Sequence, residues 1–316
     1  MDENNETSHR CTGSPAARPL VLCAGMAVVD FMFRVDRFPS SNTKAMAREF
    51  FLTGGGNAAN ATIAITRLGG RARFCGPVGD DEFGQRVLDG LVREGVDIGA
   101  AQRVKGASTS VSGIFVDPAG ERLLTTRRAQ GLEKAPPPPD CARLLEGVDA
   151  LLADNHLPDF VLPICGAARA RNIPVVLDVD KPATEAADPL LALASHAIFA
   201  AEAMRAAAAT GDLAAALERA STFCRGFVAV TEGAAGALWH DGRALQRQEA
   251  FAVNAVDTLA AGDVFHAAFA LALAEGRAEA EALRFASAAA ALKCTRFGGI
   301  VGAPTRDEVE HLLMKS

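Results

Sequence analysis

A run of small residues closed by an acid, Asp257-Thr258-Leu259-Ala260-Ala261-Gly262-Asp263, has the clearest potential for chemistry, and it leads into an apolar helical segment. The first backbone N–H groups of a helix have no partner within the helix, and together with the helix dipole they bind anions. Small side chains leave those groups open to a ligand. Asp263 can therefore take a proton from a hydroxyl group while the N–H groups of residues 260–263 hold the charge of a transferring phosphoryl group. The alternative is that Asp263 only caps the helix.

A glycine-rich turn far upstream, Gly54-Gly55-Gly56-Asn57-Ala58-Ala59-Asn60, precedes a second helical segment. Glycines let the backbone come close to a ligand. Asn57 and Asn60 are three residues apart, so they share one face of the helix. Each amide can both donate and accept hydrogen bonds, which suits a polyhydroxylated ligand. Taken alone, the pattern also fits a glycine turn followed by an asparagine cap.

The two motifs together resemble the two signatures of the ribokinase-like, or phosphofructokinase-B type, carbohydrate kinases. The second signature of that family reads Asp-Thr-x-Gly-Ala-Gly-Asp, and Ala260 stands at its first glycine. Alanine keeps the turn small, so we expect the anion hole to persist. The resemblance extends from about Leu20 to the C-terminus. It is closest to ketohexokinases and bacterial sulfofructose kinases, notably in Val176-Leu177-Asp178-Val179-Asp180-Lys181-Pro182 and in residues 281–286 and 291–299.

The resemblance implies which residues hold the sugar. Four residues are expected to contact its hydroxyl groups: Asp30, Gly56, Asn57 and Asn60. Carboxylates and amides suit this role because they pair with hydroxyl groups that would otherwise be desolvated without partners. Arg122, on a predicted hairpin, would place its planar fork of donors near the sugar and the transferring phosphate; a solvated hairpin charge is the alternative. Lys44 and Lys181 are weaker candidates for a cation at this place.

The resemblance also implies where the nucleotide binds. Thr231-Glu232-Gly233-Ala234-Ala235-Gly236 is similar to the family's Thr-x-Gly-x-x-Gly loop, so Thr231, Gly233 and Gly236 are expected along the phosphates and ribose of ATP. A simple turn at a strand end is the alternative. The segment from Lys293 to Gly299, with Lys293 and Gly298 as contacts, is expected to border the adenine.

A metal-binding pair seen in many relatives, Asn-x-x-Glu, is missing from the corresponding region, residues 199–204, where Glu202 is the acidic residue. Mg²⁺ is still expected, because the nucleotide phosphates carry it and it needs few protein ligands. No protein metal ligand is assigned, and dependence on a monovalent cation is left open.

These residues predict an ATP-dependent kinase of a small ketose or a related sugar, with a lid whose closure excludes water. One alternative is a nucleoside kinase of the same superfamily, whose base could stack on Phe31 and Phe33. Another is a catalytically silent sugar-binding regulator, although the acid and the turn that it would lack are present. His156 and Thr126 stand where sulfofructose kinases have an arginine and an asparagine, so an unsubstituted ketose or a sugar acid is favoured over sulfofructose.

The elements that position these residues alternate along the chain. Short apolar runs predict buried strands at 20–25, 150–153, 174–177, 197–199 and 227–230. Helical patterns at 58–68, 83–94 and 160–171 lie between them. This order predicts an α/β fold, a doubly wound and mostly parallel sheet with helices on both faces. Such sheets bind ligands at the carboxyl ends of their strands, where both glycine-rich loops would open.

Two segments, about 30–53 and 107–127, break this alternation and predict strand pairs at 31–38 with 45–52 and at 109–116 with 122–126. In the family such insertions form a small β-sheet lid over the sugar, which often pairs with the lid of another subunit. We expect one apolar face bearing Phe31, Phe33, Ile114 and Val116, and a homodimer formed through it.

Composition excludes several classes of protein. The chain has 316 residues, 49% of them hydrophobic and 22% charged, with a net charge of −6, which is typical of a globular protein that does not bind nucleic acid. No apolar run reaches the roughly 18–20 residues that span a membrane. Seven scattered cysteines argue against a disulfide framework or a zinc site and favour the cytoplasm. Residues 1–18 are expected to be a disordered tail and residues 19–316 one kinase domain, with a sugar and ATP as its partners.

Overall fold

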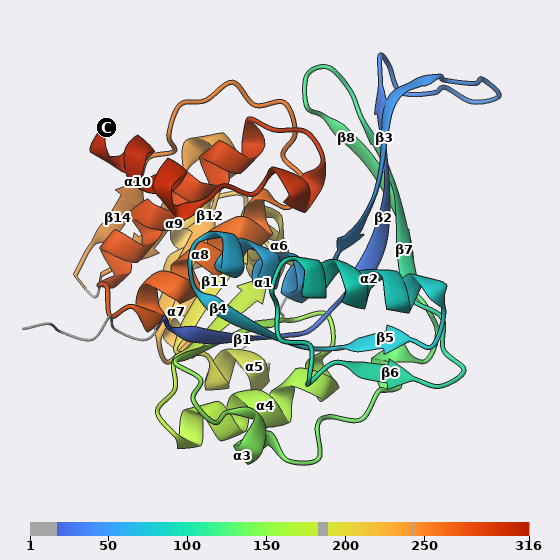
Figure 1. The fold of residues 1–316 in the computed structure, drawn as a ribbon. Helices are drawn as coiled ribbons and strands as arrows, with labels where there is room; N and C mark the ends of the chain where they lie inside the picture. The colour runs from blue at the N-terminus through green and yellow to red at the C-terminus, as the bar shows by residue number, and fades with distance from the viewer. Residues whose placement is uncertain (1–17, 183–188, 242, 316) are drawn as a thin grey trace, which may run out of the picture.

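The computed structural model describes residues 18–182, 189–241 and 243–315, and a central sheet of eight strands forms its body (Figure 1). Its strands are β1 Leu20–Ala24, β4 Arg71–Cys75, β9 Ala150–Asp154, β10 Val175–Val179, β11 His196–Ala200, β12 Phe227–Thr231, β13 Ala237–His240 and β14 Leu245–Gln248. They lie in the order β14-β13-β12-β11-β10-β9-β1-β4. Pairing is parallel from β12 to β4, and β13 and β14 form an antiparallel edge. The five predicted buried strands are confirmed as β1 and β9 to β12.

Helices cover both faces of this sheet (Figure 1). One face carries α1 Asn57–Arg67, α2 Glu82–Arg93, α8 Ala261–Ala274, α9 Glu279–Cys294 and α10 Arg306–Met314. The other face carries α3 Cys141–Leu144, α4 Pro158–Ala170, α5 Pro189–Leu193, α6 Ala201–Ala208 and α7 Leu213–Phe223. Short 3₁₀ turns lie at Leu132–Lys134, Gly233–Ala235 and Gly299–Gly302. Side chains of β1 alternate between the two layers, Val21 and Cys23 on one side and Leu22 on the other, because strand side chains point to opposite faces.

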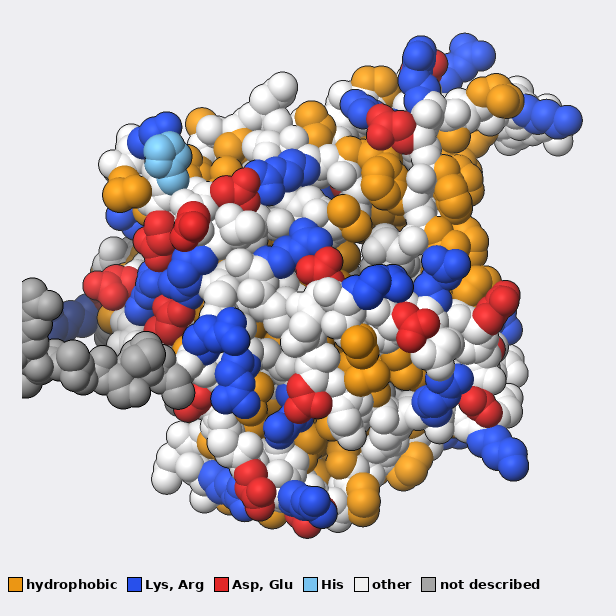
Figure 2. Space-filling model, in the orientation of Figure 1, with side chains coloured by type: hydrophobic (Ala, Val, Ile, Leu, Met, Phe, Trp, Pro, Cys, Tyr) orange, Lys and Arg blue, Asp and Glu red, His pale blue; other side chains and the backbone are white. Residues whose placement is uncertain are grey.

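A second sheet projects from the body as the predicted lid (Figure 1). Its strands are β2 Val28–Val35, β3 Ala47–Gly55, β7 Ser110–Val116 and β8 Arg122–Arg127, in the order β3-β2-β7-β8. A separate two-stranded sheet joins β5 Pro77–Gly79 to β6 Gln102–Val104. Both predicted strand pairs of the lid are therefore present. Figure 2 shows hydrophobic side chains gathered along this projecting part.

The prediction that one lid face bears all four apolar residues is wrong. In the pairing of β2 with β7, Phe31 lies beside Gly113 and Met32 beside Ile114. Ile114 and Val116 therefore share the inner face with Met32, where they are buried. Phe31 and Phe33 lie on the outer face instead. Alternation within each strand is visible in the sequence, but the register between the two strands is not, and a shift of one residue exchanges the faces.

Two further expectations, on the cysteines and on the N-terminal tail, concern residues that lie partly outside the described ranges. Six cysteines fall among the described residues and no disulfide joins them, whereas Cys11 lies outside the described residues. Residues 1–17 of the expected tail are also outside the described residues. Within the described ranges, the structure contains no helix with the length and apolar character needed to cross a membrane.

Candidate active site

The two motifs meet where α1 and α8 begin. Asn60 on α1 donates a hydrogen bond from its Nδ2 to Oδ2 of Asp263 on α8 at 2.6 Å, across 203 residues of sequence. Helix α1 starts after Gly56, whose φ of 92° suits glycine. A Cβ at that position would lie 2.7 Å from the carbonyl oxygen of Met26. The absence of a side chain there thus lets the turn before α1 approach the β1–β2 connection.

The turn before Asp263 has the form of an anion hole. Ala260 is left-handed, with φ of 62° and ψ of 8°, and α8 starts at the next residue. An alanine in this conformation costs about 1–2 kcal/mol, so the turn is held against strain. In the described part of the chain, the backbone N–H groups of Ala260, Gly262 and Asp263 have no acceptor, whereas that of Ala261 donates to the Thr258 carbonyl at 3.3 Å. Three donors at a helix start are thus available to a phosphoryl group.

Asp257 ties this turn to the segment expected to border the adenine. Its carboxylate is fully buried and accepts hydrogen bonds from the backbone N–H groups of Leu259 at 2.8 Å, Gly298 at 3.1 Å and Gly299 at 2.8 Å. One buried carboxylate therefore shapes both the anion hole and the neighbouring turn.

Lys293 was predicted to contact the nucleotide, and the burial of its side chain corrects that prediction. Its ammonium is 0% exposed, donates to the Asp257 carbonyl at 2.7 Å and lies 3.1 Å from Oδ2 of the same residue. Burial lowers the pKa of Lys293, and the carboxylate opposes that effect. The side chain points inward because a buried charge requires a partner, so it stabilises the turn rather than facing a ligand.

Asp263 has the electrostatics of a base that works near neutral pH. Burial, and after it the Asp178 carboxylate, raise its pKa to about 7, while the Asn60 hydrogen bond and His266 oppose the rise. Burial also raises the pKa of Asp178. A carboxylate with a pKa near the working pH can accept a proton efficiently and release it again.

His266, one turn after the base, is a residue that sequence reasoning missed. Its Nδ1 donates to the Gly262 carbonyl at 2.7 Å, and its Nε2 lies 3.4 Å from Oδ1 of Asp178 and 3.3 Å from the Ile198 carbonyl. Its spacing of three residues from Asp263 on a helix was the available signal, because such residues share a face.

The expected sugar residues face the same region. Asn57 donates from Nδ2 to Asp178 at 2.9 Å and to Asp180 at 3.2 Å. Asp30 lies on the inner face of the lid, hydrogen-bonded to Ser112, and burial raises its pKa to about 6 while that bond opposes the rise. Ser112 in turn lies 3.1 Å, oxygen to oxygen, from Thr126. The expected sugar residues thus form two polar groups, one on the lid around Asp30 and one on the body around Asn57.

Arg122 and Lys44 differ in their surroundings. Arg122 is exposed at the start of β8, and its charge helps to lower the pKa of the Lys293 ammonium beneath the anion-hole turn, after burial as the main cause. The hairpin before it packs on the body, since a Cβ at Gly120 would lie 3.2 Å from the Val256 carbonyl carbon. Lys44 is exposed in the β2–β3 loop, and no contact places it near Asp263.

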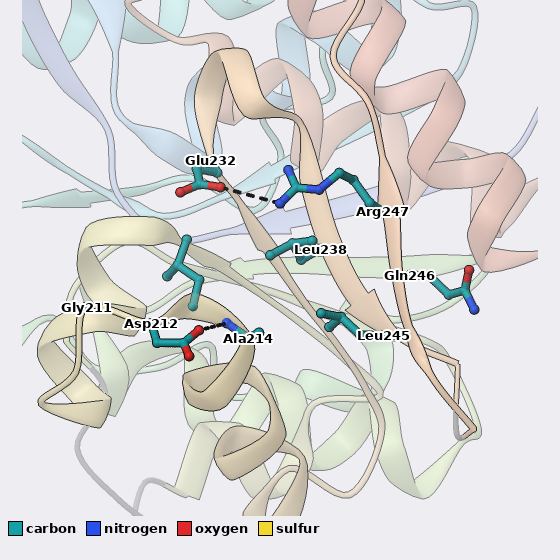
Figure 3. Close-up of a pocket in the computed structure, with 9 residues that line it drawn as sticks. Gly211, Asp212, Ala214, Glu232, Leu238, Leu245, Gln246 and Arg247 are labelled. Atoms are coloured by element: carbon teal, nitrogen blue, oxygen red, sulfur yellow. Dashed lines mark hydrogen bonds and ion pairs between the residues drawn. The ribbon is translucent and has the colours of Figure 1, made fainter.

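The predicted nucleotide loop follows β12. Glu232 donates its backbone N–H to the Gly236 carbonyl at 2.7 Å, and Gly236 has a φ of 87° that suits glycine. Arg205 holds the Glu232 carboxylate at 2.8 Å, and Arg247 lies 3.9 Å from it. Figure 3 shows Arg247 reaching toward Glu232 above a pocket of about 380 Å³ between the start of α7 and strands β13 and β14. None of the residues assigned to the sugar lines that pocket.

Known proteins resemble the chain over nearly its whole length. A family model described as pfkB family carbohydrate kinase matches residues 18–306. The ribokinase of Bacillus subtilis (strain 168) is 30% identical over 299 residues, which cover 93% of this chain and 99% of that protein. The ATP-dependent ribose-1-phosphate kinase of Halopiger xanaduensis is 32% identical over 300 residues, which cover 93% and 97% of the two chains. The structure of Arabidopsis thaliana ribokinase complexed with ribose and ATP has a TM-score of 0.82 at 25% identity, covering 95% of this chain and 100% of that one.

These matches include both motifs and confirm the predicted family and the ribokinase-like fold. The closer resemblance to ketohexokinases and sulfofructose kinases stays a prediction. One assignment follows from three findings. The family match spans most of the chain, relatives share about a third of its residues, and the fold is the same. The chain belongs to the pfkB family of carbohydrate kinases and is an ATP-dependent phosphotransferase.

Proposed function

We propose that the protein transfers the γ-phosphoryl group of ATP to a hydroxyl group of a small ketose or a related sugar, with Asp263 as the general base. The observation that carries this proposal is the pairing of Asn60 with Asp263. Asn60 Oδ1 is buried and has no hydrogen-bond partner among the described residues, although its Nδ2 is bonded to the base. An orphaned buried acceptor beside a base suits a ligand hydroxyl, since leaving it unpaired costs free energy.

In the proposed reaction the acceptor hydroxyl gives its proton to the Asp263 carboxylate as its oxygen bonds to the γ-phosphorus. The bond between that phosphorus and the bridging oxygen breaks, and ADP leaves. The free N–H groups of Ala260, Gly262 and Asp263 and the Arg122 guanidinium would stabilise the charge on the transferring group. Asp30, Asn57 and Asn60 would hold the sugar.

The nucleotide is proposed to lie along Thr231, Gly233 and Gly236, with Gly298 near the adenine. Mg²⁺ is proposed to arrive on the nucleotide phosphates, whose charge it would neutralise. In the parts of the chain that the structure describes, no group of three or more acidic, histidine or cysteine side chains is arranged to hold a metal. Glu202, in the first turn of α6, is the acidic residue of the region 199–204, where the metal-binding pair is missing.

Residues 19–316 would act as one kinase unit in which segments of about 30–53 and 107–127 close over the sugar. A cytoplasmic location is proposed on chemical grounds, since the reaction uses ATP and free thiols persist in a reducing compartment.

Release of ADP over a panel of acceptors tests the function. The panel should contain ketoses, sugar acids and nucleosides, and also ribose, ribose 1-phosphate and fructose, because proteins named for kinases of these sugars are among the relatives. We expect turnover with at least one sugar and none with nucleosides. Turnover of nucleosides alone would favour the nucleoside kinase, and a folded protein inactive on the whole panel would favour a silent regulator.

Asn57→Ala is expected to raise the KM for the sugar about tenfold or more and to change the KM for ATP by less than about twofold. The reason is that Asn57 begins the sugar-side helix and orients Asp178 and Asp180, whereas the nucleotide loop lies after β12. Steady-state kinetics with each substrate varied in turn would measure both constants. Equal changes in the two would indicate a general packing role.

We further propose a homodimer formed through the outer face of the lid. This face carries a cluster of aromatic rings, with Phe33 5.1 Å from Phe50 in a tilted pair and 5.6 Å from Phe115 in a stacked pair, between centroids. Phe50 is 53% exposed and Leu123 is 49% exposed, which leaves apolar area that a second lid could cover.

Sedimentation at micromolar concentration is expected to give twice the chain mass of 32.9 kDa. Phe50→Glu should yield the single-chain mass, because a charge would be buried in the contact. Met314→Glu, at an exposed apolar residue on α10, is the control and should leave the dimer intact. A wild-type protein that sediments only as a single chain would refute the dimer.

A further inference from the structure

Three side chains that can carry positive charge meet beside the sugar site. Arg128 follows β8, His156 follows β9 and Lys181 follows β10, so they come from three separate strands. Nη2 of Arg128 lies 3.0 Å from Nδ1 of His156, and Nζ of Lys181 donates to the His156 carbonyl at 3.3 Å. His156 and Lys181 could be singled out separately from the sequence, but no sequence pattern indicates that Arg128 lies beside them.

Two of these charges, those of Arg128 and Lys181, both contact His156 and form no ion pair among the described residues. Within residues 18–182, 189–241 and 243–315, no carboxylate lies within 4.0 Å of the cationic nitrogens of Arg128 or Lys181. The nearby carboxylate of Asp180 is already paired, accepting from His156 Nε2 at 2.7 Å and from Asn57 Nδ2 at 3.2 Å. Burial, and next the charge of Arg128, lower the pKa of Lys181, while the carboxylates of Asp180 and Asp154 oppose the decrease. Two like charges brought together are unfavourable until an anion lies between them.

Both cations are held in place by the protein. Asn155 is buried and bonds Lys181 twice through backbone groups, donating to its carbonyl at 3.0 Å and accepting from its N–H at 3.4 Å. Arginine only donates hydrogen bonds, so Nδ1 of His156 accepts from Arg128 while Nε2–H donates to Asp180. The Asp180–His156 pair therefore orients the guanidinium. Arg128 is exposed, and its contact with His156 is what fixes the position of its guanidinium.

The position of the cluster relates it to the acceptor. Asn57, which bonds Asp180, lies one helical turn, about 5 Å, from Asn60 and the base that Asn60 contacts. Arg128 stands two residues beyond Thr126, whose hydroxyl bonds Ser112 beside Asp30. The cations thus adjoin the proposed sugar residues through His156 and Asp180, and in the described part of the chain neither contacts Asp263.

Building on the proposed function, we propose that Arg128 and Lys181 form a subsite for an anionic group on the acceptor sugar, a carboxylate or a phosphate ester, with His156 as a positioning residue. The group would sit at the end of the sugar away from the hydroxyl that is phosphorylated. Hydrogen bonds from two cations to one anionic group are charge-assisted and short, and they would relieve the repulsion within the cluster.

Matched acceptors test the subsite. Each neutral sugar is compared with the same sugar carrying a terminal carboxylate and with the one carrying a terminal phosphate, by kcat/KM for ADP release. We expect one of the two anionic forms to exceed the neutral form about ten- to a hundredfold. Which form does so identifies the anionic group. A wild-type enzyme that prefers the neutral sugar would overturn the proposal.

Substitutions locate the effect. Arg128→Gln and Lys181→Gln should each lower the ratio of anionic to neutral kcat/KM at least tenfold, and the second variant serves if the first does not fold. Arg127→Gln, on the neighbouring exposed cation bonded to Ser108, should leave the ratio unchanged. Equal losses for anionic and neutral acceptors in both variants would show a packing role and overturn the assignment.

Binding calorimetry without ATP separates this proposal from the proposed function. The anionic sugar should bind the wild-type protein at least tenfold more tightly than its neutral parent, whether or not either is phosphorylated. Loss of that difference in Arg128→Gln would support the subsite even for a protein without turnover. Equal affinity of the two sugars for the wild-type protein would reject the subsite even if both are phosphorylated.

Discussion

Replacing Asp263 by asparagine is expected to lower kcat by about 10²–10⁴-fold. The amide cannot take the proton of the acceptor hydroxyl, but it can still bond Asn60, so the site should keep its shape. ADP release under saturating substrates measures the loss. A variant that kept about half of the wild-type kcat or more would remove Asp263 from the role of base.

The pH profile of the wild-type enzyme gives an independent readout of the same residue. Because the pKa of Asp263 is raised to about 7, kcat should decline below that pH in proportion to the ionised fraction. Activity that stays constant down to pH 5 would contradict a base with this pKa.

Stability should change in the opposite sense to activity. The folded pKa of Asp263, about 7, lies above the reference value of 3.8, so the folded protein binds the extra proton. The contribution of this group to stability is therefore complete below about pH 4 and is lost as pH rises toward 7. Asp263→Asn avoids that loss, so its melting temperature should equal or exceed that of the wild type at neutral pH. A much lower melting temperature would indicate that the carboxylate has a structural role.

Lys293→Met is expected to lower the free energy of unfolding by about 3–5 kcal/mol, because it leaves the buried Asp257 carboxylate without its cation. Asp257 also holds the N–H groups of Leu259 and Gly299, so the KM for ATP should rise as well. Urea unfolding at neutral pH measures the first effect. A loss below about 1 kcal/mol would mean that the three backbone hydrogen bonds suffice to stabilise the carboxylate.

Two further variants give this experiment its controls. Lys105→Met removes an exposed charge in the loop after β6 and should change stability by less than about 0.5 kcal/mol. Adding Asp257→Asn to Lys293→Met removes the stranded charge, so part of the lost stability should return.

Two of the strands that sequence reasoning missed, β4 and β14, lie at the edges of the central sheet. Strand β4 alternates arginine with apolar residues, and β14 has only one apolar residue in four. Edge strands face solvent on more than one side, so they lack the continuous apolar run that marks a central parallel strand. The central strands β1 and β9 to β12 are buried on both faces and could be predicted for that reason.

The sequence by itself determined the parallel α/β core, the two lid segments and the small-residue turn that ends at Asp263. These features depend on periodicity and turn chemistry within about ten residues, which a chain carries locally. Only the tertiary structure decided which side chains meet: the burial of Lys293 against Asp257, the opposite faces of Phe31 and Ile114, and the convergence of Arg128, His156 and Lys181. Strand register and contacts across many residues follow from how whole elements pack, and no local pattern of residue types records them.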